Sequence, residues 1–415
     1  MKLLPTRIPQ IRMTMPLNLG RRSGESLIGL DIQPGFVAAV QARVNGSIVP
    51  ERAAALALPA DSVRDGEVMD EDAVSEVLRE LFEGSGLSKQ VRVGVANQRT
   101  VLRTLELPPV TDQKELAAAV NFQAQDQVPM PLNNAVMDFH PLGIIDTPAG
   151  PRQRVVLVAA QRDMIERLLG AVRRAGLTAQ GVDLSAFALI RSLYRPNPEQ
   201  TGRVLYLNVD GLTNLAIAEG TVCRFTRVVG SGLEGMASEV AERRSIALTE
   251  ARALLAAVDL TAPAPVAQDS LAGAAESAPA LEQDEPPISD EDAEDSERAM
   301  SYEELTDGDG VPTPQAPQSD ADLLTVLENG IRDISGEVRN SLDFHRSQDG
   351  GGEVSHVVMS GSAQDIPGFA EALQASLGVE VRCEEVGLPE QGLPDGISAH
   401  RLAVATGLAA AEAPQ

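Results

Sequence analysis

Apolar and polar positions along the chain predict a mixed α/β protein in which one arrangement of elements occurs twice. The first copy begins near Leu27 with three strands, followed by a helix whose apolar residues recur every three or four positions, and by a further strand. The second copy begins at Val204, again with three strands before its helices and next strand. The opening strand of the second copy is almost entirely apolar, which is typical of a strand buried on both faces.

Each opening strand ends in an aspartate, Asp31 in the first copy and Asp210 in the second. Internal duplication of a mixed α/β unit predicts two lobes with a cleft between them. We expect the first lobe over residues 27–200 and the second over 201–260 and 321–415, after a flexible N-terminal segment over 1–26.

Residues 261–320 differ from the rest of the chain in composition. They contain 16 acidic residues, one basic residue and eight prolines, with almost no apolar periodicity. A segment with so little apolar surface cannot offset the entropy of folding, so we expect a disordered acidic insert.

The overall composition argues against several classes of function. The net charge is -26, aromatic residues make up 3 % of the chain, and there is no tryptophan. A surface this acidic repels phosphate backbones, so we expect no nucleic-acid binding. The two cysteines lack C-x-x-C spacing, the four histidines are scattered, and no apolar run reaches about 18 residues. These features favour a cytoplasmic protein with no zinc site and no transmembrane segment.

Several segments resemble those of one protein family, both in amino-acid sequence and in their order along the chain. They are LIGLDIQPGFVAAVQ, LRTLELPP, ELAAAVNFQAQDQVPMPLNNAVMDFHPLG, EVRNSLDFH and VMSGSAQDIPGFAEALQASLGVEV. Together they resemble the PilM family, the actin-like component of type IV pilus machinery, which is related to the cell-division protein FtsA. The resemblance covers roughly residues 27–260 and 321–411. It implies a two-lobed fold of the actin/Hsp70 ATPase superfamily, with an FtsA/PilM-type inserted subdomain over about 98–180.

The resemblance also implies a function and partners. The function it implies is that of a scaffold at the cytoplasmic face of the inner membrane, which binds the cytosolic tail of the membrane protein PilN. The pilus motor ATPases are further possible partners. The family's tail core, usually written I-N-L-L-P, is similar to Leu3-Leu4-Pro5 of this chain, and one hypothesis is that this segment occupies the chain's own partner groove. We place that groove in the inserted subdomain, at Phe122, Val128, Met130 and Phe139.

In this superfamily, turns after the two aspartates bind the phosphates of a nucleotide, and the aspartates order Mg²⁺. The resemblance therefore gives Asp31 and Asp210 as magnesium residues if ATP is bound. The residues that correspond to the nucleotide-binding turns are Asp31, Gln33, Gly35, Asp210, Gly211, Thr213, Asn214, Gly361 and Ser362.

The first of these turns departs from the family pattern. Gln33 places a side chain where glycine is usual, and Pro34 lacks the N–H group that would bind a phosphate oxygen. The segment that usually offers a glutamate and a lysine to the nucleoside has Glu250 but no lysine. We therefore expect a scaffold with a degenerate nucleotide pocket and no catalytic residues. The alternatives are an active actin-like ATPase that drives pilus assembly and an FtsA-like filament-forming protein.

Overall fold

The computed structural model describes residues 27–45, 47–196, 202–261, 320–348, 350–388, 392–393 and 397–410. The predictions for residues 1–26, including Leu3-Leu4-Pro5, lie outside this part of the chain. The prediction for the acidic insert also lies outside the described residues, except at Thr261 and Asp320, the two ends of the insert.

The first lobe contains a five-stranded sheet in the order β10-β6-β1-β2-β3. Its strands are β1 (Ile28–Gln33), β2 (Phe36–Asn45), β3 (Ser47–Ala57), β6 (Gln90–Val95) and β10 (Thr178–Leu184). Strand β1 pairs antiparallel with β2 and parallel with β6, so it lies at the centre of the sheet. All six residues of β1 are buried, including the polar Asp31 and Gln33. A short hairpin, β4 (Val63–Arg64) and β5 (Glu67–Val68), follows β3.

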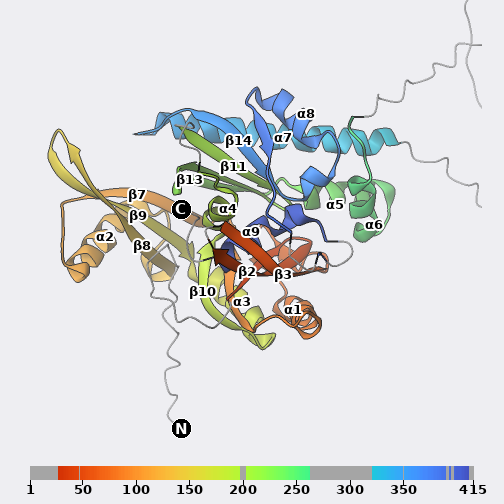
Figure 1. Cartoon of the computed structure of the whole chain (residues 1–415), viewed down its shortest axis with the longest axis horizontal. Helices are drawn as coiled ribbons and strands as arrows, with labels where there is room; N and C mark the ends of the chain where they lie inside the picture. The colour runs from red at the N-terminus through yellow and green to blue at the C-terminus, as the bar shows by residue number, and fades with distance from the viewer. Residues whose placement is uncertain are drawn as a thin grey trace, which may run out of the picture.

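The second lobe repeats this topology. Its sheet has the order β13-β12-β11-β14-β15, with β11 antiparallel to β12 and parallel to β14. The strands are β11 (Arg203–Val209), β12 (Thr213–Glu219), β13 (Val222–Val229), β14 (Val354–Ser360) and β15 (Val381–Cys383). The duplication predicted from the sequence is thus confirmed at the level of strand order and direction. Figure 1 shows the two lobes one above the other, with the second in green and blue.

Helices cover both sheets. In the first lobe they are α1 (Glu71–Ser85), α3 (Arg162–Arg174) and α4 (Ser185–Leu193); in the second they are α5 (Leu233–Arg244), α6 (Leu248–Ala256), α7 (Asp320–Ser347) and α8 (Phe369–Leu377). Helix α1 begins after Asp70, whose carboxylate accepts hydrogen bonds from the N–H groups of Asp72 and Ala73. The apolar stripe of α7 is buried in the core of the second lobe, as its spacing predicts.

The inserted subdomain has a separate sheet and a small core of its own. Strands β7 (Thr100–Leu107), β8 (Ala135–Thr147) and β9 (Gly150–Gln161) form a sheet in the order β7-β9-β8, and α2 (Gln113–Gln127) packs on it. A short 3₁₀ turn, η1 (Leu132–Asn134), joins α2 to β8. The subdomain projects to one side of the two lobes (Figure 1). It is narrower than residues 98–180, because α3 packs on α1 and β10 belongs to the first sheet.

The chain returns to the first lobe at its C-terminal end. After the 3₁₀ turns η2 (Ser362–Asp365) and η3 (Ala399–Leu402), helix α9 (Ala403–Ala409) packs against β1 and α4. Arg92 donates hydrogen bonds to the carbonyl oxygens of Leu408 (3.0 Å) and Ala410 (2.8 Å), which lie at the end of this helix. The assignment of all of 321–415 to the second lobe therefore needs correction. Apolar periodicity identifies a helix but does not say which lobe it covers.

Candidate functional site between the two lobes

The two aspartate turns meet at the boundary between the lobes. Asp31 and Asp210 are each 1 % exposed. Asp210 directly follows β11, whereas Asp31 lies within β1, which continues to Gln33, two residues beyond its predicted end. A side chain at Gly211 would collide with the carbonyl oxygen of Pro34, so the backbones of the two turns are in contact. Gly35 has a φ of +86°, a conformation that favours glycine and that reverses the chain tightly between β1 and β2.

Asp31 is held by a residue of its own turn. The Nε2 atom of Gln33 donates a hydrogen bond of 2.7 Å to Oδ2 of Asp31. The pKa of Asp31 is raised to about 7, chiefly by burial; the hydrogen bond from Gln33 opposes this rise, and the nearby Asp210 adds to it. The side chain that replaces the usual glycine therefore binds the aspartate that the family assigns to magnesium.

Asp210 is bound by three donors from the second lobe. Its Oδ1 accepts hydrogen bonds from the backbone N–H (2.7 Å) and the hydroxyl (2.6 Å) of Ser362, and its Oδ2 accepts one from Asn208 (3.1 Å). Gly361, with a φ of +97°, allows the Ser362 backbone to approach β11 this closely. Burial raises the pKa of Asp210, whereas the bonds from Ser362 and the charge of Arg401 lower it.

An ion pair lies directly against the first turn. Arg252 of α6 donates a hydrogen bond of 2.9 Å through Nε to Glu234 of α5, and its Nη2 binds the other carboxylate oxygen. A Cβ atom on Gly35 would lie 2.5 Å from Oε2 of Glu234, so the carboxylate is packed on the glycine. Both residues line a cavity of about 240 Å³ between the lobes, which Pro34, Ser362 and Arg401 also line.

Sequence reasoning missed Glu234 and Arg401 as residues of this cavity. The signal for Glu234 lay in Gly230-Ser231-Gly232, the turn that leads into α5. A side chain at Gly232 would collide with the carbonyl oxygens of Asp210 and Gly211, so this glycine lets α5 begin beside the second aspartate turn.

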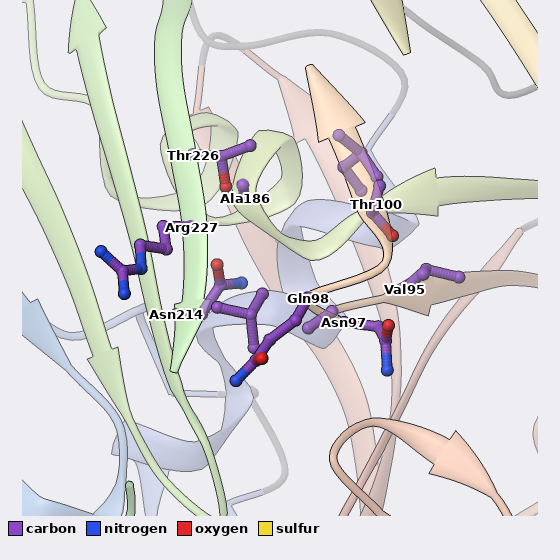
Figure 2. A pocket seen from close by; sticks show the side chains of 11 residues that line it. Val95, Asn97, Gln98, Thr100, Ala186, Asn214, Thr226 and Arg227 are labelled. Carbon is purple, nitrogen blue, oxygen red and sulfur yellow. The ribbon is translucent and has the colours of Figure 1, made fainter. Parts of the chain in front are cut away.

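The predicted site residues Thr213 and Asn214 point in different directions. The hydroxyl of Thr213 donates a hydrogen bond of 2.6 Å to the carbonyl oxygen of Ser231, near the aspartate turns. Asn214 instead lines a second cavity, together with residues of the first lobe and of the inserted subdomain (Figure 2). The structure therefore brings together Asp31, Gln33, Gly35, Asp210, Gly211, Gly361 and Ser362, whereas Asn214, which is paired with Asn208 across β11 and β12, lines a neighbouring cavity.

Comparison with known proteins identifies the family. A family model described as type IV pilus assembly protein PilM matches residues 29–252, more than half of the chain. The chain belongs to the PilM family.

Solved structures agree with this assignment. The chain is similar to a chain of a PilM–PilN type IV pilus biogenesis complex, with 18 % identity and a TM-score of 0.65, over 93 % of this chain and 98 % of that one. The fold is thus the actin-like fold predicted from the sequence. Two more distant similarities are to the ethanolamine utilization protein EutJ from Carboxydothermus hydrogenoformans (15 % identity, 96 % and 92 % covered, TM-score 0.47) and to MreB5 of Spiroplasma citri bound to ADP (13 %, 92 % and 94 %, 0.44).

In this PilM-family chain the four residues predicted to form a partner groove differ in exposure. Val128 is buried in the core of the inserted subdomain, and Met130 and Phe139 pack partly against that core. Phe122 of α2 is 71 % exposed. Phe122 is therefore the one of the four that offers most of its side chain to another molecule.

The described residues lack both a metal-binding cluster and a membrane-spanning helix. They contain no group of three or more histidine, cysteine, aspartate or glutamate side chains that could hold a metal ion. Nor do the helices among them include one that is long and apolar enough to cross a membrane.

Proposed function

We propose that this chain is a scaffold of type IV pilus assembly that binds the cytosolic tail of a PilN-like membrane protein at the cytoplasmic face of the inner membrane. The observation that carries the proposal is the family match, together with the similarity to a PilM–PilN complex over nearly the whole of both chains. Motor ATPases of the pilus are proposed as further partners, on the family resemblance alone.

We further propose that the nucleotide pocket is degenerate. Three observations support this. The backbones of the two phosphate turns are in contact at Pro34 and Gly211, and the carboxylate of Glu234 is packed on Gly35. The aspartates proposed for Mg²⁺ already accept hydrogen bonds from Gln33 and Ser362. These contacts favour a pocket that binds a magnesium nucleotide weakly.

The expected loss of affinity follows from the chemistry of the first turn. Pro34 cannot donate a hydrogen bond to a phosphate oxygen, and the loss of one charge-assisted hydrogen bond costs about 1.5–3 kcal/mol. That loss alone weakens binding by roughly 10- to 150-fold, because each 1.4 kcal/mol corresponds to about a factor of ten.

Two binding measurements test the proposal. Calorimetry with Mg-ATP should detect no binding tighter than tens of micromolar, on the order of the loss estimated above. A fluorescent peptide that contains the I-N-L-L-P core should bind the purified chain, and Asp210→Asn, which keeps an acceptor for Ser362, should bind it equally well. Low-micromolar ATP binding, or phosphate release that Asp210→Asn abolishes, would favour the ATPase alternative instead.

A further inference from the structure

The outer edge of β3 borders a cavity in the first lobe. Among the described residues β3 pairs with β2 on one side and with no strand on the other, so it is an edge of the first sheet. The cavity beside it has a volume of about 640 Å³. Its walls are β3 itself, the C-terminal part of α1, and the residues Gly392, Leu393 and Ile397. We refer to it as the edge groove.

The edge groove has the features that an added strand requires. Residues 53–55 of β3 are three successive alanines, all partly exposed, so small side chains leave space beside the strand. The larger apolar side chains that line the groove are Leu56, Leu81, Leu393 and Ile397. An edge strand presents N–H and C=O groups that pair with an extended chain. The groove therefore suits an extended segment with apolar side chains.

The charges at the edge groove favour a basic segment. Glu51 and Glu80 both line the groove; Glu51 already forms an ion pair of 3.8 Å with Arg43, and Glu80 is exposed. The last turn of α1 contains no basic residue, and the C-terminal end of a helix attracts positive charge. Arg52, the one basic residue that lines the groove, donates a hydrogen bond of 3.0 Å to the Gly86 carbonyl oxygen. The acidic insert is therefore a poor occupant.

The N-terminal part of the chain contains a segment of the required kind. Residues 11–15 read Ile-Arg-Met-Thr-Met, in which apolar and polar side chains alternate as in a half-buried strand. Pro9 and Pro16 flank this segment, and proline is typical of the limits of a strand. Residues 1–22 contain five basic residues and no acidic one, so the segment also has the charge that the edge groove favours.

The register of the first sheet shows that this segment can reach the edge groove. Ile28 at the start of β1 pairs with Gln41 of β2, and Gln41 pairs with Arg52 of β3. Neighbouring strands are about 4.8 Å apart, so a strand outside β3 would lie about 14 Å from Ile28 at this level. The 12 residues 16–27 can span up to about 40 Å. Because β3 runs away from this level, the shortest connection makes the added strand antiparallel to β3.

We propose that residues 11–15 form a sixth strand of the first sheet, antiparallel to β3 in the edge groove of the same molecule. Ile11, Met13 and Met15 bury against the apolar side chains of the groove, and the basic residues of the segment lie near Glu80. The contact covers an edge that would otherwise be open to pairing with another chain. For residues 11–15 it replaces the expectation of a flexible segment. The inference does not depend on the proposed function.

Hydrogen exchange of the full chain tests the proposal. Met13→Pro combined with Thr14→Pro removes two successive N–H groups, one of which must face β3, because successive N–H groups of a strand point to opposite sides. Exchange at the amides of residues 53–56 should become about tenfold faster or more, since loss of about 1.4 kcal/mol corresponds to that factor. Asn18→Pro with Leu19→Pro, outside the proposed strand, is the matched control and should change the rates by less than about twofold.

A change of charge provides a second measurement that leaves the N-terminal segment intact. Glu80→Arg should speed exchange at residues 53–56 several-fold, whereas Glu76→Arg, the same change at another exposed position of α1, should not. Unaltered exchange at β1 would show that each variant is folded.

Two results would overturn the inference. One is equal exchange at residues 53–56 in the unmodified chain and the double-proline variant at positions 13 and 14. The other is protection that increases with protein concentration and accompanies a dimer mass in light scattering, which would make a second copy the occupant of the edge groove.

Discussion

Asp31 provides a direct test of the structure of the aspartate turns, because it is a buried carboxyl group with one neutral hydrogen-bond donor. Its folded-state pKa is raised to about 7 by burial. The folded protein therefore binds this proton more tightly than the unfolded chain, whose aspartates have pKa values near 3.9. The contribution to stability is fully present below about pH 4 and is lost as the pH rises to about 7.

The magnitude follows from the difference between the two pKa values. About three pKa units correspond to about 4 kcal/mol, which is an upper value for the destabilisation of the folded state at pH 8. About 2 to 3 kcal/mol of this difference should develop between pH 5 and pH 8. Asp31→Asn removes the titrating group but keeps an oxygen that can accept the hydrogen bond from Gln33. Its free energy of unfolding should therefore exceed that of the unmodified chain at pH 8, by a margin that shrinks as the pH falls.

Urea titrations at pH 5 and pH 8 measure this margin. Asp126→Asn on the exposed surface of α2 is a suitable control, because it changes the net charge equally and should shift stability by no more than about 0.5 kcal/mol at either pH. If Asp31→Asn shows the same margin at both pH values, or is less stable at pH 8, Asp31 is not a buried carboxyl of the kind described.

Three further predictions concern other parts of the chain. Replacement of residues 261–320 by a short Gly/Ser linker should leave the melting temperature nearly unchanged, because surface insertions cost little loop entropy; a large drop would show that the insert packs on the body. Gly407→Ala should lower stability by about 3 kcal/mol or more in a urea titration, since a side chain there would collide with the Ala188 backbone; a smaller loss would contradict the close packing of α9 on α4. Phe122→Ala, at a position 71 % exposed, should leave stability unchanged but weaken binding of the tail peptide about 5- to 30-fold; equal affinity would remove Phe122 from the partner surface.

The regular elements could be predicted from the sequence because their signals are local. Strand-end aspartates and apolar periodicity identified both copies of the duplicated unit, and the two sheets have the same order of strands. The exact start of α2 is harder to predict. Thr111 and Asp112 both precede the helix, and it is Asp112 that accepts the hydrogen bonds from the N–H groups of Lys114 and Glu115. Both residue types are common at helix starts, so the sequence alone does not distinguish them.

The candidate site was less predictable because its contacts join segments that are distant in the sequence. Glu234 and Arg252 lie on different helices, and their position against Gly35 depends on how the second lobe meets the first. The separation of Thr213 from Asn214 could have been anticipated. Adjacent residues of a strand point to opposite faces, so only one of the two can face the aspartate turns. The resemblance to nucleotide-binding relatives placed Thr213 and Asn214 in one motif. It therefore assigned both residues to the same site, although their side chains alternate along β12.

Asn214 is an exception to the rule that buried polar side chains are hydrogen-bonded. A buried carboxamide without partners lowers stability, and an apolar side chain of similar size would remove that cost. Elsewhere in the site the buried polar groups have partners: Asn208 donates to Asp210 and accepts from Ser360. Because Asn208 and Asn214 are directly paired across β11 and β12, the same two strands place one asparagine in a complete network and the other at an open cavity. The contrast between these neighbours is therefore local, because the strands that hold Asn208 in a complete network are the same strands that leave the Asn214 carboxamide without a partner among the described residues.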